Sequence, residues 1–361
     1  MITTGEARRA AEVWLQAEAS LYPELVGAIL AGSTRTRAPT TPHPPGSDVD
    51  LFLLVDAAVP SDIIAPRGRF GPRKLGFRGV VLEPSFHDAR LLADPETVLG
   101  DGHLAPLFTE PCILLDPHGR LGALAAAVTP EFRRRCHATR RLDQALAAAA
   151  PNNTPFAIPD VPALRAPCWR HVAFGFCVMR CAGAVLAAGL RYPTMRRSFV
   201  VAREVLAAVG RNDVAEELLR LLGSAALDRS AVEALATEAA RTYDVAVGVR
   251  HTPVVMDWNV SPDARELERA AIRELIDSGH HREALYQLLL VRTIAQGIIE
   301  NDAPAPVRAE ACVGYQRLLT ALGIDSDAAL AARADALRAF MPTLREACEA
   351  VLARAPGLRE N

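Results

Sequence analysis

The chain opens with one helical pattern and then changes to short apolar runs of strand length. Apolar residues recur at helical spacing over 4–21, which predicts an amphipathic helix. Short apolar runs that stop at turn-forming residues predict strands at 25–30, 47–56, 79–86 and 111–119. The connection before the last of these runs is long enough for a further short helix. This part of the chain therefore predicts a small sheet with flanking helices.

Three proline-rich segments interrupt the regular pattern. Segment 34–46 holds four prolines, and 60–76 is rich in Pro, Gly and Arg, so both are predicted as loops. Residues 151–167 hold five prolines and are predicted as a linker or an irregular segment.

From Thr129 onward the pattern is helical. The predicted helices are 131–149, 167–189, 195–209, 212–222, 229–249, 262–278, 280–300, 304–322, 327–339 and 343–354. Glycines stand at several predicted helix ends, where a left-handed cap favours them: Gly210, Gly223, Gly279 and Gly323. The sequence thus predicts an α+β protein. A small mixed-sheet domain with flanking helices occupies 1–125, and a larger all-helical domain occupies 126–361.

Composition narrows the function classes. A net charge of −2, from 40 basic and 42 acidic residues, argues against binding nucleic acid through the overall field of the protein, but leaves a local basic cleft open. Seven cysteines without a Cys-x-x-Cys pair are typical of a reduced, cytoplasmic protein. The apolar stretch 171–190 is interrupted by Arg180, which predicts a buried helix rather than a membrane span. The N-terminus lacks the pattern of a signal peptide.

Three acidic side chains are predicted to meet in the first domain. Asp48 and Asp50 start a predicted strand, and side chains alternate along a strand, so both project to one face. Two neighbouring carboxylates repel each other unless a cation lies between them. Glu83, in the run Val80-Val81-Leu82-Glu83, is expected on a neighbouring strand, where an isolated acid would be costly. Oxygen ligands without His or Cys favour Mg²⁺ or Mn²⁺, and three carboxylates can hold two such ions for displacement at phosphorus.

A second set of residues is suited to a nucleoside triphosphate. Gly32-Ser33 directly follows an apolar strand, so the backbone there can approach a polyphosphate while the serine offers a hydroxyl and an N–H. Arg35 and Arg37 follow and can add charge at the β- and γ-phosphates. Ser47, which precedes the first aspartate, is counted with them as a nucleotide-binding residue.

In order and context, these segments resemble the DNA polymerase β-type nucleotidyltransferase superfamily. The matching segments are AILAGS, then SDVDLFLLV, then VVLEPSF, within residues 5–120. The third acid, Glu83, lies 33 residues after Asp50, which is similar to the aminoglycoside nucleotidyltransferase branch. A helical C-terminal domain that faces the site is also usual in this superfamily. One departure is the loop between Ser33 and Asp48, whose fourteen residues are more than usual and rich in proline, which puts the roles of Arg35 and Arg37 in doubt.

The resemblance implies a metal-dependent nucleotidyltransferase. Asp48, Asp50 and Glu83 would hold Mg²⁺ or Mn²⁺, and Glu83 would also deprotonate the acceptor hydroxyl. Gly32 and Ser33 would cradle the β- and γ-phosphates of ATP or another NTP. The implied reaction moves AMP to a hydroxyl of a small molecule, such as an aminoglycoside or another natural product, and releases pyrophosphate.

Other functions stay open at this point. The same chemistry suits a nucleotide, a tRNA end or a protein side chain as acceptor, and near-neutral charge argues mildly against tRNA. A non-catalytic nucleotide-binding module is a further alternative. The amphipathic run 327–356 is expected to pack on the helical bundle, with a homodimer interface as the second interpretation.

Several other groups carry weaker signals. Four residues of one predicted helix suggest buried thiols rather than a zinc site: Cys168, His171, Cys177 and Cys181. A basic cluster suggests a solvated face with ion pairs more than a phosphate-binding cleft: Arg133, Arg134, Arg135, His137, Arg140 and Arg141. Arg196 and Arg197 open a helix, where cations oppose the macrodipole, which hints at an anionic contact. Asp257-Trp258 and Asp244 are candidates for acceptor contacts in the helical domain, without a way to choose among them.

Overall fold

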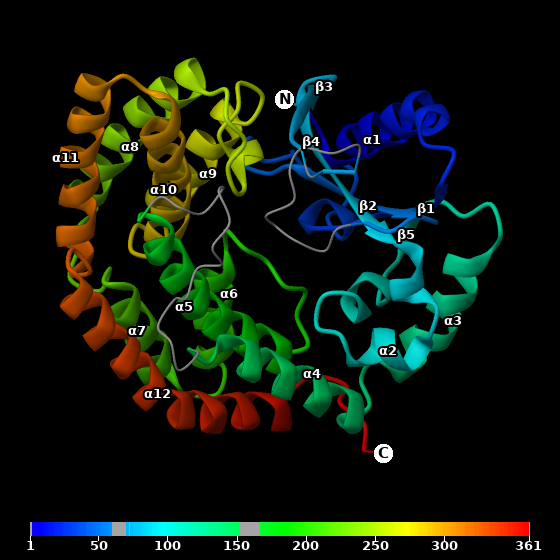
Figure 1. Ribbon diagram of the computed structural model, residues 1–361. Helices are drawn as coiled ribbons and strands as arrows, with labels where there is room; N and C mark the ends of the chain where they lie inside the picture. Colours follow the sequence, from blue (N-terminus) through cyan, green and yellow to red (C-terminus); the bar gives the residue numbers. More distant parts are fainter. Residues whose placement is uncertain (1, 60–69, 72, 152–166, 361) are drawn as a thin grey trace.

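A computed structural model describes residues 2–59, 70–71, 73–151 and 167–360 of the chain. The described residues form an α+β structure in which a five-stranded sheet comes first and helices follow (Figure 1). The strands are β1 (Leu25–Leu30), β2 (Val49–Val55), β3 (Leu75–Phe77), β4 (Val80–Asp88) and β5 (Cys112–Leu115). The predicted fold class is therefore confirmed at this level.

The sheet is mixed, with the order β3-β4-β2-β1-β5. Its central pair, β2 and β4, is parallel, and the other neighbouring pairs are antiparallel. The parallel register sets Asp50 of β2 directly beside Glu83 of β4. This one pairing brings together two acids that lie far apart in the sequence.

Helices cover both faces of the sheet. On one face, α1 (Thr4–Glu18) packs Ala7, Trp14 and Leu15 against the apolar side of the strands. Thr3 caps this helix in a capping box with Glu6. On the other face lie α2 (Pro95–Gly100) and α3 (Arg120–Glu131). The sheet is thus buried on both sides.

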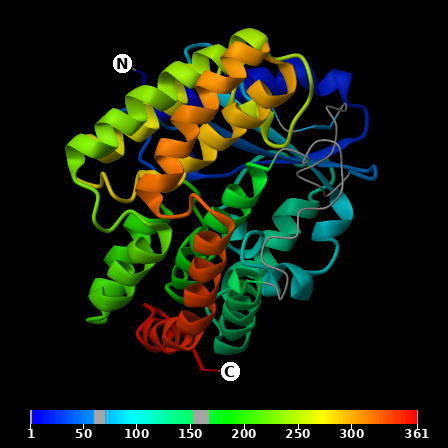
Figure 2. The same ribbon diagram turned by 60° about the vertical axis from the view of Figure 1, so that its left-hand side comes forward.

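The later helices form a second, larger core. They are α4 (Arg135–Ala149), α5 (Trp169–Ala188), α6 (Ser198–Ala207), α7 (Asn212–Leu222), α8 (Arg229–Val249), α9 (Arg265–Asp277), α10 (Leu285–Asp302), α11 (Ala305–Leu322) and α12 (Asp327–Ala353). In both views α12, in red, lies at the same end of the molecule as α4 (Figures 1 and 2), and the two helices are in contact. The predicted packing of the C-terminal run on the bundle is therefore confirmed.

Helix α5 has the length and apolarity of a membrane-spanning helix, but most of it is buried against other helices. Its neighbours include α4, α6, α10 and α12. Within the described residues, this agrees with the prediction of a buried core helix.

Several element boundaries differ from the predictions. Strand β3 begins within the segment 60–76 that was predicted as a loop, because Leu75 and Phe77 pair with β4 and pack on the core of the sheet. Helix α3 was not predicted. It runs across residue 125, the predicted end of the first domain, and packs on the sheet through Leu121 and Leu124. The two last predicted helices form one helix, α12, which continues through Pro342. The predicted linker lies almost wholly outside the described residues.

Candidate active site

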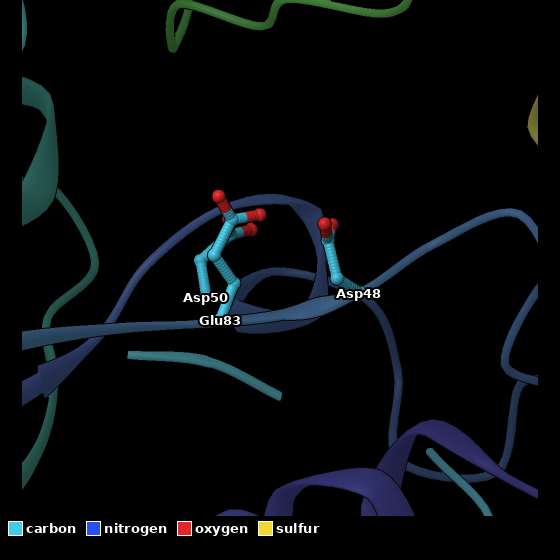
Figure 3. Close-up of side chains that lie close together, drawn as sticks. All are labelled: Asp48, Asp50 and Glu83. Atoms are coloured by element: carbon cyan, nitrogen blue, oxygen red, sulfur yellow. The ribbon is translucent and has the colours of Figure 1, made fainter. Parts of the chain in front are cut away.

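The three predicted acids meet at one point of the sheet. Asp48 lies just before β2, Asp50 is the second residue of β2, and Glu83 is its neighbour on β4. One carboxylate oxygen from each lies within 4.8 Å of the others. Figure 3 shows the three side chains rising from the same side of the strands. The predicted clustering of these acids is therefore what the structure shows.

Gly32 shapes the space beside Asp50. It ends the turn after β1 with φ +63°, a left-handed conformation that favours glycine. A Cβ on Gly32 would lie 1.7 Å from Oδ2 of Asp50. The Gly-Ser turn therefore allows the second acid to occupy its place, which is a role that the sequence alone did not indicate.

Asp48 is the most strongly paired of the three acids. Arg196, in the segment before α6, donates from Nη2 to Asp48 Oδ2 at 2.7 Å and from Nη1 to Oδ1 at 3.2 Å. The ammonium of Lys74 lies 3.3 Å from the same Oδ2. The anionic contact expected for Arg196 thus exists in this structure, and its partner is a carboxylate of the sheet.

Lys74 is surrounded by carboxylates. Besides Asp48, its Nζ lies 3.5 Å from Glu83 Oε2 and 2.8 Å from Oε1 of Glu268, which comes from α9. The Lys74 side chain is only 2 % exposed and that of Glu268 only 1 %. Gln287 of α10 donates to the other Glu268 oxygen at 2.6 Å. A buried ionic network therefore joins the sheet to α9 and α10.

The acids differ strongly in protonation. Burial would raise the pKa of Asp48, but Arg196 and Lys74 hold it well below its usual range. Burial, followed by the charge of Asp48, raises the pKa of Asp50 to about 7. Burial also raises the pKa of Glu83 to about 8, with the charge of Asp48 adding to the rise and Lys74 opposing it. Asp50 and Glu83 thus lack a full countercharge and favour an added cation.

Trp258 reaches the site from the helical part of the chain. Its indole Nε1 lies 3.3 Å from Glu83 Oε1 and donates to it. The short 3-10 helix Asp257–Asn259 that carries it is fixed by two neighbours: Tyr243 donates to the carbonyl oxygens of Asn259 and Ser261, and Arg250 to that of Asp257. The structure therefore selects one aromatic residue from the candidates that the sequence left unranked.

Of the predicted nucleotide-binding residues, the two serines lie next to the acids, whereas the side chain of Arg35 points elsewhere. Ser33 and Ser47 lie beside the acids with their hydroxyls 3.2 Å apart. Arg35 instead turns its guanidinium to the carbonyl oxygens of Pro106 and Leu107, at 2.6 and 2.8 Å. In this structure Arg35 is thus a buried residue that ties the Gly-Ser turn to the 3-10 helix Ala105–Phe108, and not a free cation facing the acids.

The weaker candidates have structural contacts. His171 lies 3.2 Å from the hydroxyl of Tyr315, and the four thiol and imidazole groups of α5 and its start do not form a metal cluster within the described residues. In the basic cluster, Arg141 is buried and donates to Leu99 and Phe132 carbonyl oxygens. Arg135 pairs with Glu360. Cys168 and Cys181 are buried, as predicted, and the pair Arg135–Glu360 agrees with the predicted ion pairs. The buried Arg141 does not belong to a solvated face, so that part of the prediction was wrong.

The donor set fits a hard divalent cation. The three carboxylates are the sole cluster of potential metal ligands found in the described part of the chain. They offer oxygen only, which suits Mg²⁺ or Mn²⁺. The space left by the missing Cβ of Gly32 borders the same oxygens.

Two residues of the ionic network around the acids, Lys74 and Glu268, were not predicted from the sequence. Glu268 gives no local signal, because its partner lies 194 residues away. Lys74 did give one: it is the only lysine in a chain with 40 basic residues. All the other Lys or Arg positions of the chain are arginine, so position 74 is the single exception.

Comparison with known proteins adds no assignment. No protein-family model matches the chain, and no curated protein matches it significantly.

Proposed function

We propose that this protein is a metal-dependent nucleotidyltransferase that transfers a nucleoside monophosphate, AMP from ATP in the first instance, to a hydroxyl group of a small molecule. The observation that carries the proposal is the meeting of Asp48, Asp50 and Glu83 within 4.8 Å, beside the Gly32-Ser33 turn. The order of these pieces along β1, β2 and β4 supports it. Pyrophosphate is the second product.

The acids would hold Mg²⁺ or Mn²⁺ through their carboxylate oxygens. A bound ion would supply positive charge to the reacting phosphate and to the departing pyrophosphate. Asp50 and Glu83, which have raised pKa values, have most to gain from that charge. Asp48 already has two cationic partners, Arg196 and Lys74.

In this proposal Glu83 accepts the proton of the acceptor hydroxyl. Trp258 donates a hydrogen bond to its Oε1, which orients the carboxylate beside Asp50, and a positioned carboxylate can act as a general base. As the proton moves to Glu83, the acceptor oxygen forms a bond to the α-phosphorus. The bond from that phosphorus to the bridging oxygen breaks, and pyrophosphate leaves with the electron pair.

The backbone and hydroxyls of the Gly-Ser turn face the polyphosphate in this proposal. Ser33, which is exposed, and Ser47, which is partly buried, provide two adjacent hydroxyls. Positioning and charge neutralisation would then supply most of the rate enhancement. The choice of an aminoglycoside-like acceptor depends on the position of Glu83, which resembles that in the aminoglycoside nucleotidyltransferase branch. Aminoglycosides are therefore the first class of acceptor to test.

The test is pyrophosphate release with Mg²⁺ and each of the four NTPs. Each is assayed alone and with a panel of aminoglycosides and other hydroxylated metabolites, and Asp50→Asn protein is the blank. Release above the blank that depends on one acceptor supports the proposal. Release without an added acceptor points to a nucleotide-polymerising or self-modifying enzyme. No release, with ATP and Mg²⁺ still raising the melting temperature, favours a binding module if a broader acceptor panel also fails.

A further inference from the structure

The most unusual feature of the site is the identity of its buried cation. Lys74 is the only lysine of the chain, and it lies among carboxylates with 2 % of its side chain exposed. An ammonium is a compact point charge, whereas a guanidinium is a planar fork. The neighbouring Arg196 shows the contrast, because its fork takes both oxygens of Asp48.

The distances rank the partners of Lys74. The Nζ atom lies 2.8 Å from Glu268, 3.3 Å from Asp48 and 3.5 Å from Glu83. Only the contact with Glu268 has the length of a strong charge-assisted hydrogen bond. The two longer contacts are to acids that would hold the divalent ion.

Glu268 is built to retain the ammonium. Its other oxygen accepts a hydrogen bond from Gln287 at 2.6 Å, and the side chain is 1 % exposed. It comes from α9, outside the sheet, and it is not one of the clustered metal-ligand candidates. Of the three partners of Lys74, Asp48 and Glu83 would also bind the metal ion, whereas Glu268 would not.

We propose that Lys74 is the built-in counter-ion of the acid site and competes with the divalent ion for Asp48 and Glu83. Without the ion, Lys74 lies against both acids and is the positive charge that they share. When the ion binds, Lys74 gives up both contacts and stays on Glu268, which is thus a positioning residue. This inference rests on one part of the proposed function, the binding of a divalent ion by the three acids, and does not depend on nucleotidyl transfer.

The inference predicts opposite effects for two neighbouring substitutions. Lys74→Met removes the competitor and is expected to tighten Mn²⁺ binding by about tenfold or more, because an uncompensated buried acid pair gains most from a cation. Glu268→Gln removes the retaining partner, so Lys74 turns fully to Asp48 and Glu83 and Mn²⁺ binding weakens. If these residues served only to hold the fold together, both substitutions would weaken binding.

The affinities are measured by the electron paramagnetic resonance signal of free Mn²⁺, together with circular dichroism of each variant. Glu283→Gln is the matched control, since Glu283 is a buried carboxylate of the helical part that pairs with Arg203 at 2.9 Å. It should bind Mn²⁺ as the unaltered protein does. Weaker binding by folded Lys74→Met protein would overturn the inference while leaving the metal site intact. No Mn²⁺ binding by the unaltered protein would overturn the proposed function as well.

A second measurement needs no substitution. Because the chain has one lysine, protein labelled with [ε-¹³C]lysine gives a single lysine side-chain resonance. Saturating Mg²⁺ is expected to shift this resonance, and Mn²⁺ to broaden it. A resonance that Mg²⁺ leaves unchanged would contradict the displacement of Lys74, even if Lys74→Met protein failed to fold.

Discussion

Gly32 and Asp50 share one small space: a Cβ on Gly32 would lie 1.7 Å from Oδ2 of Asp50. The two residues are therefore coupled by contact, although they belong to different strand ends. The turn can carry no other residue without moving the second acid of the site.

Gly32→Ala is expected to abolish most activity. The methyl group must displace the Asp50 carboxylate, and a misplacement of about 1 Å costs about 100-fold in rate. The measurement is pyrophosphate release together with Mn²⁺ affinity. Gly119→Ala is the control, because Gly119 has a similar φ of +68° but nothing within 4 Å of its Cβ position. Equal losses in the two variants would show that backbone strain, not contact with Asp50, is responsible.

Asp48→Asn and Asp50→Asn are both expected to abolish activity, but only Asp48→Asn is expected to destabilise the fold. Both remove a metal ligand and should reduce pyrophosphate release to background. Asp48 is the bidentate partner of Arg196 and one of the partners of Lys74, so its loss breaks a buried ion pair and should cost about 3–5 kcal/mol. Asp50→Asn removes a like charge beside Asp48 and should leave the metal-free protein at least as stable as before. Chemical denaturation in EDTA measures both, and a larger loss for Asp50→Asn would contradict this assignment.

Much of the fold follows from local pattern. The alternation and length of the apolar runs predict β1, β2, β4 and β5, and glycines end helices such as α7 and α11 where predicted, at Gly223 and Gly323. The misses have tertiary causes. Three-residue β3 exists only because β4 offers it a partner. Pro342 does not break α12, because Phe340 and Leu344 are buried on either side of it.

The part of the site that local sequence pattern determines was also predictable. Asp48, Asp50 and Glu83 carry their signal in short motifs, and strand alternation sets their direction. Trp258, Glu268 and Arg196 reach the site from distant segments, so their proximity depends on how the helices pack on the sheet. Arg35 has the type and spacing of a phosphate ligand, yet backbone carbonyls of a segment about 70 residues away bind it.

Trp258→Phe is expected to lower kcat with little effect on the fold. The substitution keeps the ring and removes the N–H that donates to Glu83. A hydrogen bond to a charged group contributes about 1.5 kcal/mol, which corresponds to roughly tenfold in rate. If the N–H is the important part, Trp258→Ala should lose little more kcat than Trp258→Phe. A much larger loss in the alanine variant, seen in KM, would assign the ring to acceptor binding instead.

The stabilising effect of Mg²⁺ is expected to grow with pH. The folded, metal-free protein keeps protons on Asp50 and Glu83 up to about pH 7 and 8, whereas the unfolded chain has released them. Stability in EDTA therefore falls as pH rises through these values. Mg²⁺ binds the deprotonated acids and offsets this loss. Melting temperatures at pH 6, 7.5 and 9 in EDTA and in MgCl₂ measure the difference, which should widen with pH and shrink in Asp50→Asn protein. A gap that narrows toward pH 9 would contradict the assignment.

The most direct test of nucleotidyl transfer follows the label of the triphosphate. The protein is incubated with Mg²⁺, the acceptor found by pyrophosphate release, and ATP labelled with ³²P at either the α- or the γ-phosphate. If the acids around Asp50 direct attack at the α-phosphorus, the acceptor gains label from α-labelled ATP only, and the γ-label leaves in pyrophosphate. Acceptor labelled from γ-labelled ATP would show phosphoryl transfer and contradict the account.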